Sequence, residues 1–166
     1  MSAEDLLAEL DHEAIATRRM LERVPAQHLS WRPHPKAMAL GQLAWHVATI
    51  PGSIAQLAQM DGLDATSVSF EPRMPEQAAE LLPALDAALA EARAFLQAFG
   101  PDVASAPWRL SAHGREVFTI PKAGLVRSLL LNHWYHHRGE LVVYFRCLDV
   151  AVPAVYGRSA DEAPFG

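Results

Sequence analysis

The feature that most limits the fold of this chain is the recurrence of apolar side chains at helical spacing in four long segments. Residues 2–24, 39–60, 75–99 and 121–148 each carry such a stripe, and proline-rich stretches separate them. Apolar residues that recur every three or four positions form one hydrophobic face along a helix. The sequence therefore predicts an all-α fold, a four-helix bundle with long crossover loops and an irregular C-terminal tail.

Prolines and glycines mark where the predicted helices begin, bend and end. Pro75 and Pro121 suit the first turns of the third and fourth helices, where the missing N–H costs nothing. Pro51 and Gly52 lie inside the second segment and predict a kink or break there. Residues 101–120 have no helical period and end in an alternating pattern, so we expect an irregular crossover with room for a short hairpin.

Composition excludes several classes of protein. The 166 residues, 51% hydrophobic and 20% charged, suffice for one domain spanning residues 1–166 with a sizeable core. A single cysteine, Cys147, excludes a disulfide framework and thiolate zinc clusters, and we expect it to be a buried apolar thiol. A net charge of -5 without basic runs argues against nucleic-acid binding. An acidic amino terminus and the lack of long apolar runs predict a cytoplasmic protein without membrane contact.

Two histidines of the fourth segment, His133 and His137, share its apolar stripe. Their i, i+4 spacing stacks the side chains one turn apart, near enough for both imidazoles to bind one metal ion from the same side. The alternative is a pair of core histidines, each with its own hydrogen-bond partner. Buried together without an ion, they would need two separate sets of partners.

A third histidine, His46, lies on the same face of the second segment as Ile50 and Leu57. Three histidines from two helices that converge in a bundle core would form the three-ligand shell of a catalytic divalent metal, with the remaining positions open. The HExxH motif of zinc proteases is absent, because Trp134 stands where its glutamate would be.

Glu140 lies one turn beyond His137 on the same face. It could orient a ligand, act as a general base, or bind the metal itself. The alternative is a salt bridge at the rim of the bundle with one of three arginines: Arg18, Arg19 or Arg127. His136 lies at the edge of the stripe, where we expect it behind the ligands or at the surface.

The remaining histidines point less clearly to a site. His12 lies opposite the leucines of the first helix, so we expect it in solvent. Three more lie in predicted loops, from which one of them could approach the site: His28, His34 and His113.

The run from Asn132 to Leu141 resembles the fourth-helix signature H-x3-H-R-G-Q of the DinB-like superfamily, also called the DinB/YfiT-like metal-dependent enzymes. Residues 43–47 resemble the L-x-H motif that this family carries on its second helix. Residues 152–162 resemble its C-terminal P-x2-Y-G segment. The three motifs occur in the family's order and span most of the chain.

This resemblance implies an up-down-down-up bundle that holds a divalent ion, zinc or nickel, through His46, His133 and His137. The family commonly has glutamine where this chain has Glu140, a departure that makes the site more acidic. Family bundles often pair, so a homodimer is an expectation. The family name refers to damage induction and does not imply DNA binding.

Two functions from different classes fit these residues. The first is a metal-dependent enzyme acting on a small molecule, either a hydrolase or a transferase that uses a low-molecular-weight thiol, with Glu140 or His136 managing protons. The second is a non-catalytic stress-response or interaction module with a structural ion. A haem-binding bundle is disfavoured, because i, i+4 histidines on one helix cannot bind opposite faces of a haem.

Overall fold

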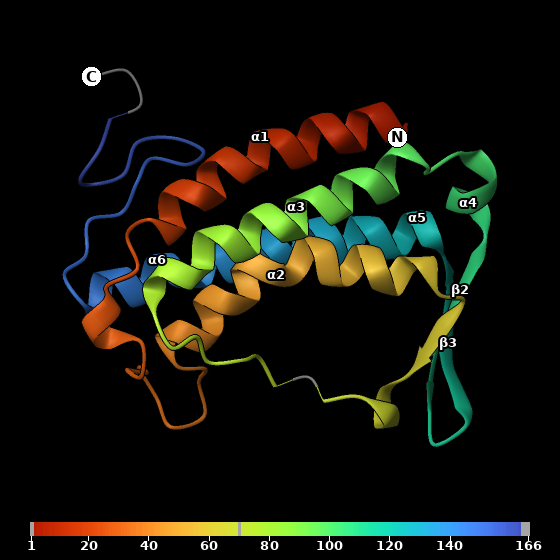
Figure 1. Ribbon diagram of the computed structural model, residues 1–166, viewed down its shortest axis with the longest axis horizontal. Coiled ribbons are helices and arrows are strands. Elements are labelled where there is room, and N and C mark those ends of the chain that lie inside the picture. Colours follow the sequence, from red (N-terminus) through yellow and green to blue (C-terminus); the bar gives the residue numbers. More distant parts are fainter. Residues whose placement is uncertain (1, 70, 164–166) are drawn as a thin grey trace.

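The computed structural model describes residues 2–69 and 71–163 and shows a mostly helical protein with a small mixed sheet at one end (Figure 1). None of the helices in these ranges is both long enough and apolar enough to span a membrane. The fourth predicted helix consists of three consecutive helical pieces. The long elements are α1(Ala3–Leu21), α2(Leu40–Gln59), α3(Leu81–Gln97) and the continuous run α5(Lys122–Leu125), η4(Val126–Asn132) and α6(His133–Cys147).

The four long helices run up, down, down and up, as the resemblance implied. Figure 1 shows α1 and the α5–α6 run pointing one way, and α2 and α3 the other. Because α2 and α3 are parallel, the chain between them must return along the length of the bundle. We call this returning segment the strap, residues 60–69 and 71–80. It includes β1(Gly62–Asp64) and the short 3-10 helices η2(Ala65–Ser67) and η3(Ala78–Glu80).

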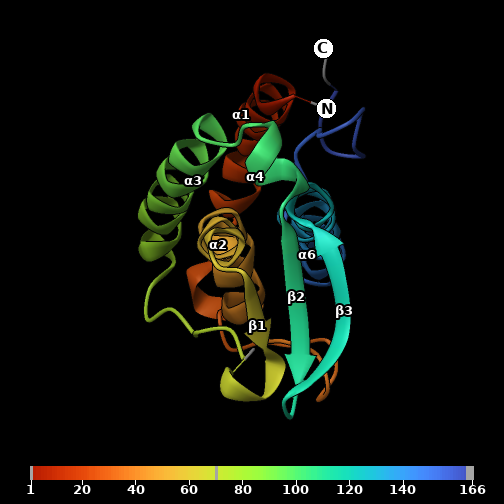
Figure 2. The same ribbon diagram turned by 90° about the vertical axis from the view of Figure 1, so that its right-hand side faces the viewer.

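The all-α prediction is wrong for one end of the molecule, where three strands form a sheet (Figure 2). β2(Pro107–Ala112) and β3(Arg115–Pro121) form the antiparallel hairpin for which the crossover left room. Positive φ angles at His113 (52°) and Gly114 (73°) suit its tight turn. β1, which lies in the strap, pairs in parallel with β2. Three residues carry no detectable period, so only the tertiary structure reveals this strand.

Of the kink or break predicted at Pro51 and Gly52, the break does not occur, since α2 is helical from Leu40 to Gln59. Both residues are buried. A Cβ added at Gly52 would lie 2.8 Å from Ala88 Cα, so the glycine allows the two helices to approach closely. The third helix begins at Leu81 rather than at Pro75, because a 3-10 turn precedes it.

A π-helical segment, η4, changes which face of α6 meets the core. A π turn holds more residues than an α turn, so later side chains are rotated relative to a regular helix. Trp134 and Phe145 therefore face the core, while His133 and His137 lie half-buried at its edge. The same rotation places Cys147 in solvent, so the prediction of a buried thiol is wrong.

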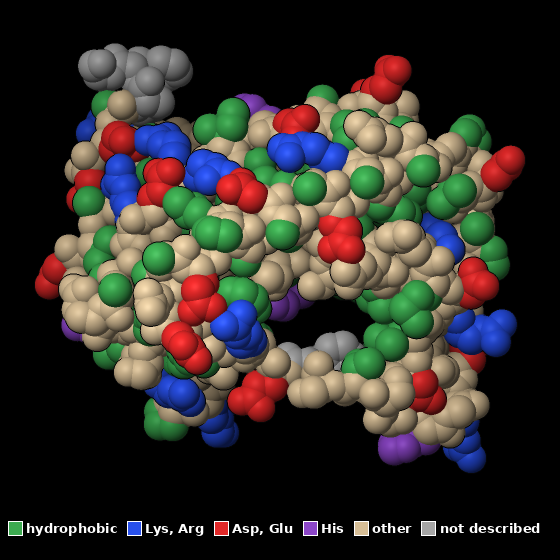
Figure 3. Space-filling view, in the orientation of Figure 1, with side chains coloured by type: hydrophobic (Ala, Val, Ile, Leu, Met, Phe, Trp, Pro, Cys, Tyr) green, Lys and Arg blue, Asp and Glu red, His purple; other side chains and the backbone are tan. Residues whose placement is uncertain are grey.

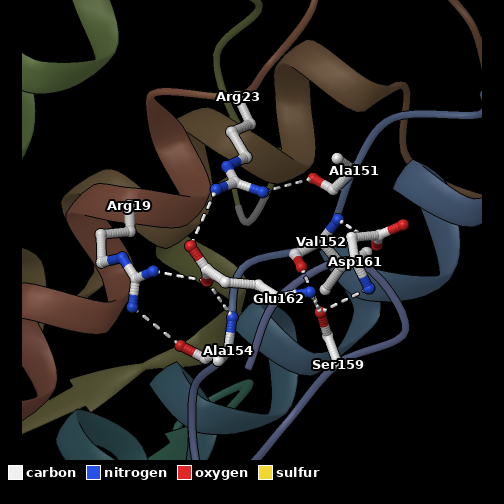
Figure 4. A network of polar contacts seen from close by, with 8 residues as sticks. All are labelled: Arg19, Arg23, Ala151, Val152, Ala154, Ser159, Asp161 and Glu162. Carbon is white, nitrogen blue, oxygen red and sulfur yellow. Dashed lines mark hydrogen bonds and ion pairs between the residues drawn. The ribbon is translucent and has the colours of Figure 1, made fainter. Parts of the chain in front are cut away.

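The C-terminal tail is irregular, as predicted, but polar contacts fix it to α1 (Figure 4). Arg19 donates to the carbonyl oxygen of Ala154 at 2.9 Å and pairs with Glu162. Arg23 reaches the carbonyl of Ala151. Within the tail, the Ser159 hydroxyl donates to the Val152 carbonyl at 2.6 Å. These contacts hold the tail against α1 without regular secondary structure.

Candidate metal centre

The structure brings together three imidazoles from two helices, His46 of α2 and His133 and His137 of α6. The Nε2 atoms of His133 and His137 are 2.7 Å apart, and those of His46 and His133 are 3.4 Å apart. All three rings are half-buried. Nitrogens bound at 2.0–2.1 Å to one tetrahedral ion lie about 3.3–3.4 Å from each other. The nitrogens therefore point at one spot, with a geometry close to that of a three-histidine ligand set.

Hydrogen bonding leaves ligand atoms free at this spot. Glu140 accepts a hydrogen bond from His137 Nδ1 at 2.6 Å, so Nε2 of the neutral ring carries the lone pair. The Nε2 atoms of the three rings face one another, and a neutral His137 ring that donates from Nδ1 cannot donate from Nε2. These residues fit a bound divalent cation better than a network of hydrogen bonds among the histidines alone.

Glu140 does not make the rim salt bridge considered as its alternative. Its two oxygens lie 2.6 Å from His137 Nδ1 and 3.4 Å from His136 Nε2. The three arginines pair with other carboxylates: Arg18 with Asp86, Arg19 with Glu162 and Arg127 with Glu9. The side chain of His136 is 64% exposed, compared with 39% for Glu140.

The surroundings favour the neutral form of the histidines. Burial, followed by the charges of His137 and His133, lowers the pKa of His46 to about 4. Burial, followed by the charge of His137, also lowers the pKa of His133. Metal ions bind neutral imidazole, so protons would compete little with a metal ion for these two histidines at neutral pH.

A cavity of about 600 Å³ adjoins two of the three histidines and is bounded by α2, the strap and the helix that carries Leu129. His46 and His133 both reach its wall. Figure 3 shows the surface hollowed between α2 and the strap, with histidine and hydrophobic side chains at the edge of the opening. Most of its lining is apolar and includes Trp45, Ile50, Ile54, Leu57, Leu63 and Leu129.

The other histidines lie away from this cluster. Among the described residues, the groups placed to share an ion contain none of His12, His28, His34 and His113. His12 is exposed, as expected. A second such group joins His136 and Glu140 to His137, but there Glu140 already accepts the Nδ1 hydrogen bond.

Sequence reasoning missed a buried ion pair next to the site. Arg138 is 3% exposed and donates from Nη1 to the Glu13 carbonyl at 3.0 Å and to the Thr17 hydroxyl at 3.1 Å. Its Nη2 donates to the Glu13 carboxylate, which also accepts from the Tyr156 hydroxyl at 2.8 Å. The signal was present, since Arg138 directly follows His137 within the quoted motif. A regular helix places it off the apolar stripe, and the π segment turns it inward.

The fold and the site define a class of protein, a helical bundle with a three-histidine cluster beside an apolar cavity. The chain belongs to the DinB family, whose sequence model matches residues 1–164. It is 26% identical over 175 residues to the protein YrdA of Bacillus subtilis, covering 96% of this chain and 92% of that protein.

Solved structures share the fold. A DinB-like protein from Bacillus cereus superposes with a TM-score of 0.70 at 24% identity, over 92% of this chain and 97% of the other. The DinB-like protein YjoA of Bacillus subtilis gives 0.68 at 17% identity, over 93% and 99%. A structure assigned to the DinB family from Exiguobacterium sibiricum gives 0.65 at 18% identity, over 96% and 95%.

Proposed function

We propose that this protein is a metal-dependent enzyme in which His46, His133 and His137 hold one divalent ion, zinc or nickel. The observation that carries the proposal is the convergence of their ring nitrogens, 2.7 and 3.4 Å apart, at the wall of a cavity large enough for a small molecule. Three protein ligands leave positions open at a catalytic ion, whereas a structural zinc site closes with four. This geometry favours an enzyme over the structural-ion alternative.

A divalent ion held there would supply Lewis-acid chemistry, polarising a substrate carbonyl or acidifying a water or thiol ligand. The chain's own residues have separate tasks. Glu140 orients His137 through the 2.6 Å hydrogen bond to Nδ1 and raises the basicity of that ring. His136 is exposed, lies 3.4 Å from Glu140, and carries protons to and from that carboxylate.

The reaction class is either hydrolysis or transfer with a low-molecular-weight thiol. Both use the same three histidines and a small-molecule substrate in the adjoining cavity. We assign the thiol reaction second place, because Glu140 adds a negative charge beside the histidines and disfavours an anionic cosubstrate.

The experiment starts with elemental analysis of protein purified without a nickel column or added metal. We expect about one zinc or nickel ion per chain. Turnover is then assayed with ester and amide panels, and with electrophiles in the presence and absence of thiols. Only the transferase depends on added thiol. Metal-loaded protein that turns over neither panel and has no exchangeable water on its ion would support the structural-ion alternative instead.

A further inference from the structure

The cavity beside the three histidines has a lining that selects a class of substrate. Four side chains on one face of α2 follow each other along it, at intervals of three or four residues: His46, Ile50, Ile54 and Leu57. At 1.5 Å rise per residue, Leu57 lies about 16 Å along the axis from His46. The cavity is therefore long, with the histidines toward one end and an apolar wall leading away from them.

The opposite walls continue this apolar surface. Leu63 and Val68 come from the strap, and Leu129 comes from η4. Apart from the histidines, the uncharged polar side chains among the described lining residues are three that carry a hydroxyl, Thr49, Ser53 and Ser69, and the amide of Gln56. Gln56 already donates to Glu91 at 2.5 Å. Contact with this wall favours aliphatic or aromatic groups at about 25 cal/mol per Å² of apolar surface buried.

Charge in the cavity argues against an anionic occupant. Apart from the histidines, Arg73 is the one cationic side chain among the described lining residues. Its guanidinium lies over the Trp45 ring, 4.3 Å from the ring centroid, and donates to the Glu80 carboxylate at 2.6 Å. Glu71 adds a second carboxylate to the lining. The carboxylate of a ligand would thus meet an arginine that already has a partner.

We infer that the site takes an uncharged molecule with an elongated apolar part along α2 and a polar reacting group at the histidines. This inference rests on the proposed metal-dependent function and specifies its substrate. The pairing of Arg73 with Glu80 is the feature that removes a docking point for anions. Low-molecular-weight thiols that carry carboxylates fit this lining poorly, whereas neutral esters, amides and electrophiles with alkyl or aryl groups fit it.

The test uses hydroxamic acids, which chelate divalent metals and can carry tails of any length. Zinc-loaded protein is titrated calorimetrically with acetohydroxamic, butanohydroxamic, hexanohydroxamic and octanohydroxamic acids. We expect affinity to rise about three- to fourfold per methylene. An analogue of octanohydroxamic acid that carries a carboxylate at the far end of its chain should bind at least tenfold more weakly than octanohydroxamic acid itself.

Two variants test the walls separately. Ile54→Asp, about 12 Å along the α2 axis from His46, should remove most of the chain-length effect and leave acetohydroxamic acid binding unchanged. The matched control is Ile15→Asp, on α1 outside this lining, where the side chain is 64% exposed and the whole series should be unaffected. Glu80→Gln should strengthen binding of a short hydroxamic acid that carries a terminal carboxylate at least threefold and leave acetohydroxamic acid unchanged, because it releases Arg73, which lies over Trp45 at the histidine end of the cavity.

The outcomes separate this inference from the proposed function. If acetohydroxamic acid binds and longer tails bring no gain, the apolar substrate class is overturned while the metal site stands. Tighter binding of the terminal carboxylate than of the alkyl compound overturns the exclusion of anions. If the protein takes up no metal and binds no hydroxamic acid, the proposed function fails and this inference fails with it.

Discussion

Two polar clusters on neighbouring turns of α6 differ in how their hydrogen bonds are satisfied. Arg138 is buried, and its guanidinium is bound by Glu13, Thr17 and Tyr156. His133 and His137 are half-buried, and their Nε2 atoms lie 2.7 Å apart. The first cluster is complete within the protein, and the second has ligand atoms directed at each other.

The two clusters show that buried polar groups can serve either stability or binding. A buried charge needs a partner, and the loss of Arg138 would leave the Glu13 carboxylate without its cation. The histidines have Nε2 atoms that face one another from two helices, which is typical of a site that binds a cation. A stability defect is therefore expected from the Arg138 cluster, and a binding defect from the histidine cluster.

The largest expected effect is loss of the buried ion pair. Arg138→Met should lower the free energy of unfolding by about 3–5 kcal/mol, because it leaves the Glu13 carboxylate buried without its cation. Urea unfolding of the metal-free protein measures this. The double variant Glu13→Leu, Arg138→Met should recover most of the loss. An equally unstable double variant would mean that packing, not charge, explains the defect.

The next effect distinguishes the histidine cluster from the ion pair. Metal at about one hundred times its Kd should stabilise the protein by about 2.7 kcal/mol, because it binds only the folded state. His133→Ala and His137→Ala should lose both the metal and this stabilisation, whereas His12→Ala should retain them. Thermal unfolding with and without zinc, together with elemental analysis, checks this. Unchanged metal content in the first two variants would contradict the site.

Acid should weaken the metal-free fold through the histidines. The unfolded chain protonates His46 near its ordinary pKa of 6.5, whereas the folded state resists protonation until about 4. The unfolded state therefore binds more protons in this window, and stability is lost as pH falls through it. Because the ring is only partly buried, we expect a loss of about 1–2 kcal/mol. Urea unfolding at a series of pH values should show a smaller loss in His46→Ala than in the unsubstituted protein.

The smallest effect concerns Glu140. Glu140→Gln keeps a hydrogen-bond acceptor for His137 but removes the negative charge, so zinc affinity should fall about tenfold. Competition with a chelating dye measures the affinity. The metal-free stability of this variant should match that of the unsubstituted protein within about 0.5 kcal/mol. Unchanged zinc affinity would show that the carboxylate has no influence on the histidine it contacts.

Much of the architecture follows from local patterns in the sequence. The apolar stripe of the first helix, with Leu6, Leu10 and Ala14, is buried as predicted. The spacing of His133 and His137 places their rings together on one helix, because i, i+4 side chains always lie one turn apart. The family resemblance, carried by the motif around these residues, is confirmed.

The sequence by itself determined the properties that are set within a few turns of the chain: four helices, the histidine pair and the family motifs. Only the tertiary structure decided the rest. The pairing of β1 with β2 and the joining of Arg138 to Glu13 depend on segments far apart in the chain, and the π-helical η4, which rotates α6, departs from the regular period that the sequence pattern assumes. Periodicity is a local property, and contacts between distant segments depend on how whole helices pack, so no local pattern predicts them.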